Sequence, residues 1–258
     1  MEENLTTNGK MKFYSCYDIL IDKDEFAKFC SMVLPNLEND EQFYCSLLAR
    51  NKWNKESNIG SKVQLKRFTS GNEYLMQKLS QLETKIGSYQ DKNNPIPQAN
   101  LGVYIMPNPR SLFNAGQDLI NEISRNTKKR VYHMNPQSMA LSCIQTNCNR
   151  KIYYDLDVDI KNLNNKQRYI GSILTNLVCL NLNKNEDFFV IETKNGCHIL
   201  LKIENMVERL GRNWFKQIES IVRTHNRYCA DAANIEMNED NLLPIPGCTQ
   251  GGFIPKLI

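Results

Sequence analysis

The stretch that decides the fold is an apolar run interrupted by three aspartates, Lys151-Ile152-Tyr153-Tyr154-Asp155-Leu156-Asp157-Val158-Asp159. Its β-branched and aromatic residues predict a β-strand. Because side chains alternate between the two faces of a strand, Asp155, Asp157 and Asp159 should project from one face. Neighbouring carboxylates repel one another unless a cation neutralises them. Oxygen ligands suit Mg²⁺ or Mn²⁺ better than zinc, so the run predicts a metal site.

The paired aspartates do not name a reaction by themselves. Two carboxylates can bridge two divalent ions about 3.5–4 Å apart, as nucleotidyl transfer requires. An Asp-x-Asp pair also occurs in glycosyltransferases and in some nucleases. The remaining alternative is an ordinary, solvated sheet edge without any metal.

Composition limits the class of protein. The 258 residues suffice for one large domain or two closely packed halves. No apolar run approaches the roughly 20 residues that span a bilayer, and the polar start Met1-Glu2-Glu3-Asn4-Leu5 does not resemble a secretion signal. We therefore expect a cytoplasmic protein that does not enter a membrane. The apolar residues 253–258 at the end suggest a chain cut from a longer protein.

Charge and cysteine content are less decisive. The formal net charge of +4 permits nucleic-acid binding without demanding it. The nine cysteines form no Cys-x-x-Cys pair, and the three histidines form no cluster with metal-ligand spacing. The sequence therefore argues against zinc and favours reduced thiols.

The elements after the aspartate run predict the fold class. Helical spacing of apolar residues predicts helices over residues 166–180 and 206–227. Asn195-Gly196 between two β-rich runs predicts a hairpin. Strand, helix, hairpin and helix in this order are typical of a split β-α-β unit.

We therefore expect an α+β fold. A single domain, residues 1–258, should consist of an N-terminal α/β part, residues 1–100, packed on a motif-bearing part, residues 101–258. In the second part we expect a short strand over residues 101–106.

Two basic clusters are candidates for contact with a nucleic acid. Each is equally compatible with a solvated basic face. The clusters are Lys62, Lys66 and Arg67, and Lys128, Lys129 and Arg130. Trp53, next to Arg50 and Lys52 in the polar stretch 51–67, could stack on a base or belong to the core.

The hairpin turn carries a second group of polar residues. Lys194 and His198 lie at its two ends and could contact phosphate oxygens. Gly196 allows a close backbone approach and a positive φ. Taken alone, the segment favours the simpler interpretation, an ordinary Asn-Gly turn with a solvated lysine and a structural histidine. Asp231, before a short apolar segment, could likewise be an ordinary surface residue.

Together, these segments resemble the archaeo-eukaryotic primase superfamily, of the primase-polymerase type. The family pattern is an apolar strand with Asp-x-Asp, then a Ser-x-His hairpin, then an Asp before a short apolar segment. The corresponding segments here are residues 152–157, Lys194-Asn195-Gly196-Cys197-His198 with Gly196 in place of the usual Ser, and Asp231.

Two further segments extend the resemblance to about residues 101–252. Leu243-Pro244-Ile245-Pro246-Gly247-Cys248-Thr249 resembles a family stretch in which an Arg is common where Pro244 stands. Asn108-Pro109-Arg110 resembles an Asn-Pro element of primase-polymerases. The CRISPR-associated primase-polymerases are the subgroup that these segments resemble most.

The resemblance implies a primase-like core whose C-terminal half is an RRM-like split β-α-β unit, and template-directed nucleotidyl transfer from dNTP or NTP to a 3′-hydroxyl. Asp155, Asp157 and Asp231 would hold two Mg²⁺ or Mn²⁺ ions. The implied nucleotide-binding residues are Lys194, Gly196, His198, Asn108, Arg110, Thr249 and Gln250.

The implied partners are a single-stranded DNA template and primer, with CRISPR adaptation proteins or a helicase as further associates. Tyr104, Tyr153 and Tyr154 are candidates for discriminating the sugar 2′-position. Two other functions stay open. One is a catalytically idle module that binds single-stranded nucleic acid, and the other is a metal-dependent nuclease or glycosyltransferase.

Overall fold

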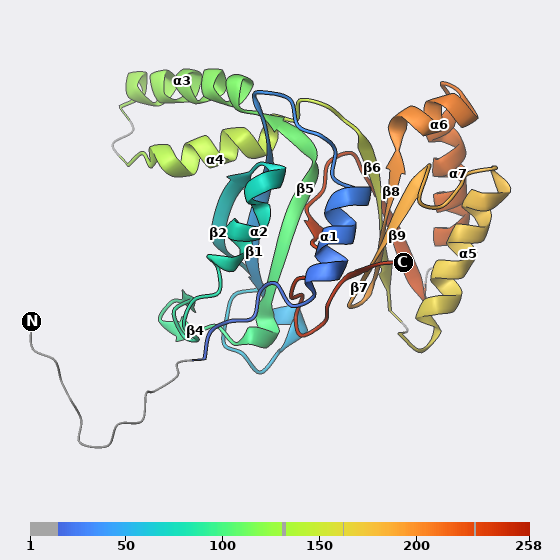
Figure 1. Ribbon diagram of the computed structural model, residues 1–258, viewed down its shortest axis with the longest axis horizontal. Coiled ribbons are helices and arrows are strands. Elements are labelled where there is room, and N and C mark those ends of the chain that lie inside the picture. The colour runs from blue at the N-terminus through green and yellow to red at the C-terminus, as the bar shows by residue number, and fades with distance from the viewer. Residues whose placement is uncertain (1–14, 131–132, 162, 230) are drawn as a thin grey trace, which may run out of the picture.

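The computed structural model describes residues 15–130, 133–161, 163–229 and 231–258. It is an α+β fold with two antiparallel sheets that lie beside each other, with α1 (Lys23–Met32) between them (Figure 1). Among the described residues, no helix combines the length and apolar character needed to cross a membrane.

The first sheet has the strand order β10-β5-β1-β2. Its strands are β1 (Glu41–Arg50), β2 (Lys62–Ser70), β5 (Leu101–Ser111) and β10 (Leu243–Pro244). The short α2 (Leu75–Ser80) packs on it, and β3 (Gln90–Asp91) pairs with β4 (Asn94–Pro95) at one end. The helical hairpin of α3 (Leu112–Lys128) and α4 (Pro136–Thr146) projects from the opposite end (Figure 1).

The second sheet has the strand order β11-β7-β8-β6-β9. Its strands are β6 (Tyr153–Ile160), β7 (Phe188–Thr193), β8 (Gly196–Lys202), β9 (Ala233–Asn238) and β11 (Lys256–Leu257). Three helices cover its outer face, α5 (Lys166–Cys179), α6 (Ile203–Leu210) and α7 (Trp214–Tyr228) (Figure 1). The order β9-β6-β8-β7, with helices on one face, is that of a split β-α-β unit.

The alternation of side chains along β6 determines which face of the second sheet carries the aspartates. Leu156 and Val158 pack into the core under α5, α6 and α7. Tyr153 points the other way, into a second core cluster shared with α1 and the first sheet. The aspartates share the Tyr153 face, so they face the first sheet and not the helices.

Several sequence predictions need correction. The proposed division at residue 100 is wrong, because β5 belongs to the first sheet and pairs with β1 along most of its length. The polar stretch 51–67 contains the start of β2. The single helix predicted over 206–227 is two helices, α6 and α7, separated by residues 211–213, where Gly211 has a φ of 73°.

An ion pair fastens β1 to the segment that leads into β6. Glu41 is buried, and its carboxylate accepts hydrogen bonds from Arg150 Nε and Asn149 Nδ2, both at 2.8 Å. The hydrogen bonds from Arg150 outweigh the cost of burial and lower the pKa of Glu41 to about 2.

We expect Glu41→Gln to lower the free energy of unfolding by on the order of 2 kcal/mol at pH 7. The folded-state pKa lies below the ordinary value of 4.5, so the contribution of Glu41 is complete above pH 4.5 and is lost as pH falls towards 2. Urea unfolding of both proteins between pH 2 and 7 measures this. A difference that stays constant over that range would contradict the ion-pair explanation.

Candidate active site

Two strands of the second sheet bring a histidine and a glutamate beside the aspartates of β6. In the sheet register, Asp157 lies opposite His198 on β8 and opposite Glu236 on β9. Directly opposed residues of antiparallel strands share a face. His198 and Glu236 therefore project with Asp157 towards the first sheet.

Asp155 is the most firmly held carboxylate of this group. It is 4% exposed, and His198 Nδ1 lies 3.0 and 3.1 Å from its two oxygens. Asn241 Nδ2 donates to Asp155 Oδ2 at 2.9 Å. The other ring nitrogen of His198, Nε2, lies 3.8 Å from Asp157 Oδ1. The imidazole therefore lies between the two carboxylates.

This arrangement shifts the pKa of both partners. Burial by itself disfavours the charged imidazole, but the charge and hydrogen bond of Asp155 outweigh it and raise the pKa of His198 to about 9. Burial raises the pKa of Asp157 to about 6 against the opposing effect of His198, and Asp155 adds to the rise. At pH 7 the His198 imidazole is therefore a cation between Asp155 and Asp157, and it stabilises their negative charge.

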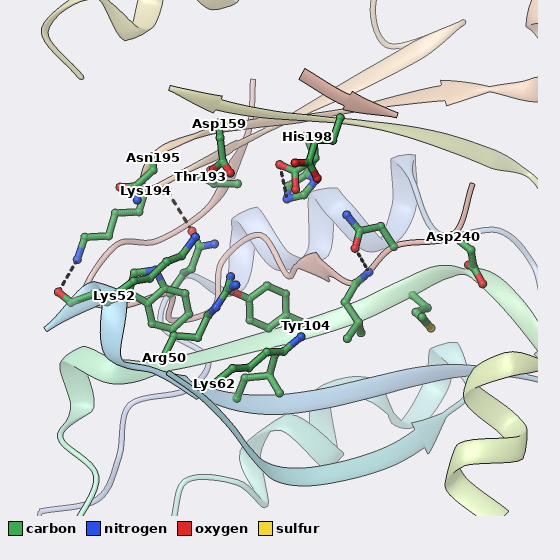
Figure 2. A pocket seen from close by; sticks show the side chains of 18 of the residues that line it. Arg50, Lys52, Lys62, Tyr104, Asp159, Thr193, Lys194, Asn195, His198 and Asp240 are labelled. Carbon is green, nitrogen blue, oxygen red and sulfur yellow. Dashed lines mark hydrogen bonds and ion pairs between the residues drawn. The ribbon is translucent and has the colours of Figure 1, made fainter. Parts of the chain in front are cut away.

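A cavity of about 440 Å³ separates this face from the first sheet (Figure 2). Its acidic lining comes from Asp157, Asp159, Glu236 and Asp240. Its basic lining consists of Arg50, Lys52 and Lys62 from the β1–β2 region of the chain, and of Lys194 from the hairpin turn. In Figure 2, Arg50 and Lys62 lie across the cavity from His198 and Asp159. The cavity thus has an acidic wall and a basic wall.

The structure places Asp231 away from this group, contrary to the sequence prediction. Asp231 lies in an exposed turn before β9 and does not line the cavity. Glu236 occupies the place opposite Asp157, five residues later. The three strand steps from Ala233 to Glu236, at about 3.3 Å each, place the start of β9 roughly 10 Å along the sheet from Glu236, and Asp231 lies in the turn before it.

Two predicted nucleotide contacts are internal to the fold. Asn108 is buried, and its side-chain amide bonds to the backbone of Ile152, Tyr153 and Glu239. Its polar atoms therefore join β5 to the start of β6. Neither Asn108 nor Arg110 lines the cavity.

Arg110 binds an acidic residue of the cavity wall. It is fully buried and forms a two-pronged ion pair with Asp240, with Arg110 Nη1 2.6 Å from Asp240 Oδ2. Asp240 precedes Asn241, which donates to Asp155. Arg110 can therefore fix the segment that orients Asp155, but it does not face a ligand.

Lys194 and Gln250 both line the cavity and are joined to each other. The backbone N–H of Lys194 donates to Gln250 Oε1 at 3.0 Å, and Lys194 Nζ donates to Gly251 O at 2.6 Å. The ammonium group is therefore engaged with the loop as well as placed at the cavity. Thr249 is buried, and its Oγ1 accepts from Gln98 Nε2 outside the cavity.

Gly196 is required by close packing. A Cβ at this position would lie 1.7 Å from the carbonyl oxygen of Val158, so the backbone approach predicted from the sequence is present. The predicted positive φ is not, because the glycines with positive φ lie elsewhere. The serine that is usual in the primase pattern would collide with β6 here.

The residues of the two predicted basic clusters do not form one surface around the cavity. Lys62 lines the cavity, whereas Lys66 is exposed on β2 and does not. Arg67 donates to Ser138 Oγ at 2.6 Å and Ser142 Oγ at 3.0 Å, which fastens β2 to α4. The cluster Lys128, Lys129 and Arg130 is exposed at the end of α3 farthest from the second sheet (Figure 1).

The ligands that this site could provide for a cation are hard oxygen donors. In the described part of the chain, no group of three or more His, Cys, Asp or Glu side chains is arranged to hold a metal ion. Asp155 is turned towards His198 and Asn241. The carboxylates of Asp155, Asp157 and Glu236 supply oxygen atoms of the kind that Mg²⁺ or Mn²⁺ prefers, but as described they do not form a ready-made site. The repulsion between these carboxylates favours the binding of a cation, which would reduce it.

The residues that sequence reasoning missed had weak local signals. Glu236 lies in the alternating segment Ala233-Asn234-Ile235-Glu236-Met237-Asn238, whose period of two predicts a strand. Arg50 ends an apolar strand, which is a common place for any charged residue.

No protein-family model, curated protein or solved structure matches the chain.

Proposed function

We propose that this protein is a nucleotidyltransferase of the primase-polymerase type. It joins a dNTP or NTP to a 3′-hydroxyl on a single-stranded template, and it both starts and extends primers. The motif order along the chain supports this function, as does the strand order of the second sheet, which agrees with an RRM-like catalytic half. We interpret the whole chain as one primase-like core.

One observation carries the proposal. A carboxylate-rich wall, with Asp157 and Glu236 opposed across β6 and β9, faces Arg50 and Lys62 across one cavity. A nucleoside triphosphate complements such a cavity, because its phosphates need positive charge on every side. A cation held by the acidic wall and the side chains of the basic wall together provide that charge.

Each side chain then has a defined role. Asp155, Asp157 and Glu236 would hold Mg²⁺ or Mn²⁺, which when bound neutralises phosphate charge and lowers the pKa of the attacking hydroxyl. Arg50, Lys52 and Lys62 would bind the β- and γ-phosphates from the opposite wall. Asn241 keeps the carboxylate of Asp155 oriented. His198 would donate a ring N–H to a phosphate oxygen.

The template and protein partners remain predictions. The exposed cluster Lys128, Lys129 and Arg130 suits a nucleic-acid backbone, although it lies away from the cavity. CRISPR adaptation proteins or a helicase would be consistent with a primase-polymerase core in the cytoplasm.

A primer-synthesis assay tests the proposal. The protein is incubated with a single-stranded oligonucleotide, labelled dNTPs or NTPs and Mn²⁺, with and without an annealed primer. We expect template-dependent products, which are lost when the divalent cation is chelated. Products that form without a template, or cleavage of the oligonucleotide, would instead support a nucleotide-sugar enzyme or a nuclease.

One observation favours a second candidate, a catalytically idle binding module. Asp155 is already bonded to His198 and Asn241, so the carboxylates are not preassembled around a cation. Nucleotide affinity measured with and without Mn²⁺ separates the two functions. An idle module should bind equally under both conditions.

A further inference from the structure

Trp53 holds an unusual position at the edge of the cavity. It ends the short η1 helix (Asn51–Trp53), directly after β1, and is half-buried. It lines the cavity and is not a member of either buried core cluster. A tryptophan that only filled the core would be enclosed by apolar side chains.

Two glycines support the indole ring from the backbone. A Cβ at Gly102 would lie 2.6 Å from Trp53 Cη2, and a Cβ at Gly251 would lie 2.5 Å from Trp53 Cγ. The two glycines belong to neighbouring segments, because Gly251 N donates to Leu101 O at 2.7 Å. The ring therefore lies directly against backbone, which fixes its position without enclosing it.

Tyr104 adds a second aromatic group beside Trp53. The two ring planes differ by 5°, with centroids 6.5 Å apart. The Tyr104 hydroxyl is buried near the side chains of Gln250 and Arg50 but makes no hydrogen bond of good geometry with any residue that the structure describes. The guanidinium of Arg50 lies 5.9 Å from the centroid of the Trp53 ring. Two parallel rings, an unpaired hydroxyl and a cation thus border the same cavity.

We propose that the half-buried ring of Trp53, with the buried ring of Tyr104 beside it, forms the binding surface for the nucleobase of the incoming nucleotide, a surface we call the aromatic floor. This inference rests on the proposed function, which places phosphates between the acidic and basic walls. Aromatic rings stack on the faces of all nucleobases, so the floor would accept any base and leave its choice to the template.

The size of the cavity favours a single nucleotide over a strand. About 440 Å³ lies within the range of small-molecule pockets. The unpaired Tyr104 hydroxyl also requires a partner, because a buried polar group without one is costly. A bound nucleoside offers sugar and base atoms that can accept this hydrogen bond.

The chain provides its own optical probe for this proposal. It has two tryptophans, and Trp214 is buried beyond the second sheet, against Tyr154 and Phe215. In a Trp214→Phe protein, fluorescence therefore reports on Trp53 alone. We expect ATP and dATP to quench this emission saturably, and inorganic tripolyphosphate, which lacks a base, to quench it far less.

Substitution of Trp53 separates base binding from phosphate binding. Calorimetric titration of Trp53→Ala with ATP should show about 5- to 150-fold weaker binding, with tripolyphosphate affinity unchanged. Trp53→Phe should recover part of the ATP affinity. Gly251→Ala should resemble Trp53→Ala, because its Cβ would displace the ring. Gly252→Ala, also at a positive φ but with nothing within 4 Å of its Cβ, is the matched control.

Each outcome decides the proposal. If Trp53→Ala binds ATP as tightly as the unchanged protein, or loses ATP and tripolyphosphate affinity equally, the aromatic floor is refuted while the polymerase proposal stands. If quenching follows a template oligonucleotide and not free nucleotide, Trp53 contacts the template and the proposal is again refuted. If the unchanged protein binds neither ATP nor tripolyphosphate, both proposals fail.

Discussion

Glu236→Ala should reduce nucleotidyl transfer by about a thousandfold or more, as should Asp155→Ala and Asp157→Ala. On the proposed function, each of these substitutions would remove a ligand for the cation that stabilises charge at the phosphate, an effect worth several kcal/mol. Asp157 and Glu236 line the cavity, and Asp155 is buried against His198. Asp231→Ala should leave the rate unchanged, because Asp231 lies in a turn outside the cavity. Single-turnover primer extension in Mn²⁺ measures all four variants.

The comparison of Glu236 with Asp231 decides between two placements of the third carboxylate. Both side chains are exposed, so neither substitution should unfold the protein. Thermal unfolding provides that control. If Asp231→Ala abolishes synthesis and Glu236→Ala does not, the site cannot have the geometry described above.

Asp240→Ala should lower the free energy of unfolding by roughly 3–5 kcal/mol. It would leave the fully buried guanidinium of Arg110 without its partner, and Arg110 Nε already has no hydrogen-bond partner among the described residues. Arg110→Met should cost less, because the remaining carboxylate is 24% exposed and water can solvate it. Urea unfolding at pH 7 measures this difference.

The exposed pair Arg223–Glu219 is the control for that experiment. The Arg223 side chain is 76% exposed, so Arg223→Ala should change stability by about 1 kcal/mol at most. Equal losses from Asp240→Ala and Arg110→Met would contradict the role of burial. If these two variants lose more catalytic rate than their loss of stability explains, that result would support the chain of contacts by which Arg110, through Asp240 and Asn241, orients Asp155.

Local sequence patterns correctly predicted the elements in which the spacing of apolar residues matches the face that the element buries. The alternation in residues 153–160 predicted both β6 and the common face of its aspartates, and Asn195-Gly196 predicted the β7–β8 hairpin. The helical period over 166–180 predicted α5. In each case, the residues that enter the core repeat with the period of the element itself.

The elements that were missed carry mixed or interrupted patterns. β9 is short, and half of its residues are Asn or Glu, so the alternation of its apolar and polar residues is a weak signal until the segment pairs with β6. β2 contains three basic residues and only one buried position, Ser70, and β5 continues through Pro107 and Pro109. Hydrogen bonds to neighbouring strands stabilise these segments, and a local pattern does not contain those bonds.

The sequence alone determined that this chain has an α+β fold, that three aspartates share one strand face, and that a lysine and a histidine flank a tight turn. Those facts follow from periods of two and 3.6 residues along the chain. Only the tertiary structure decided that Glu236, and not Asp231, lies beside Asp157 and that Arg50 and Lys62 face the carboxylates. Strand register and sheet packing join residues far apart in sequence, so no local pattern can specify them.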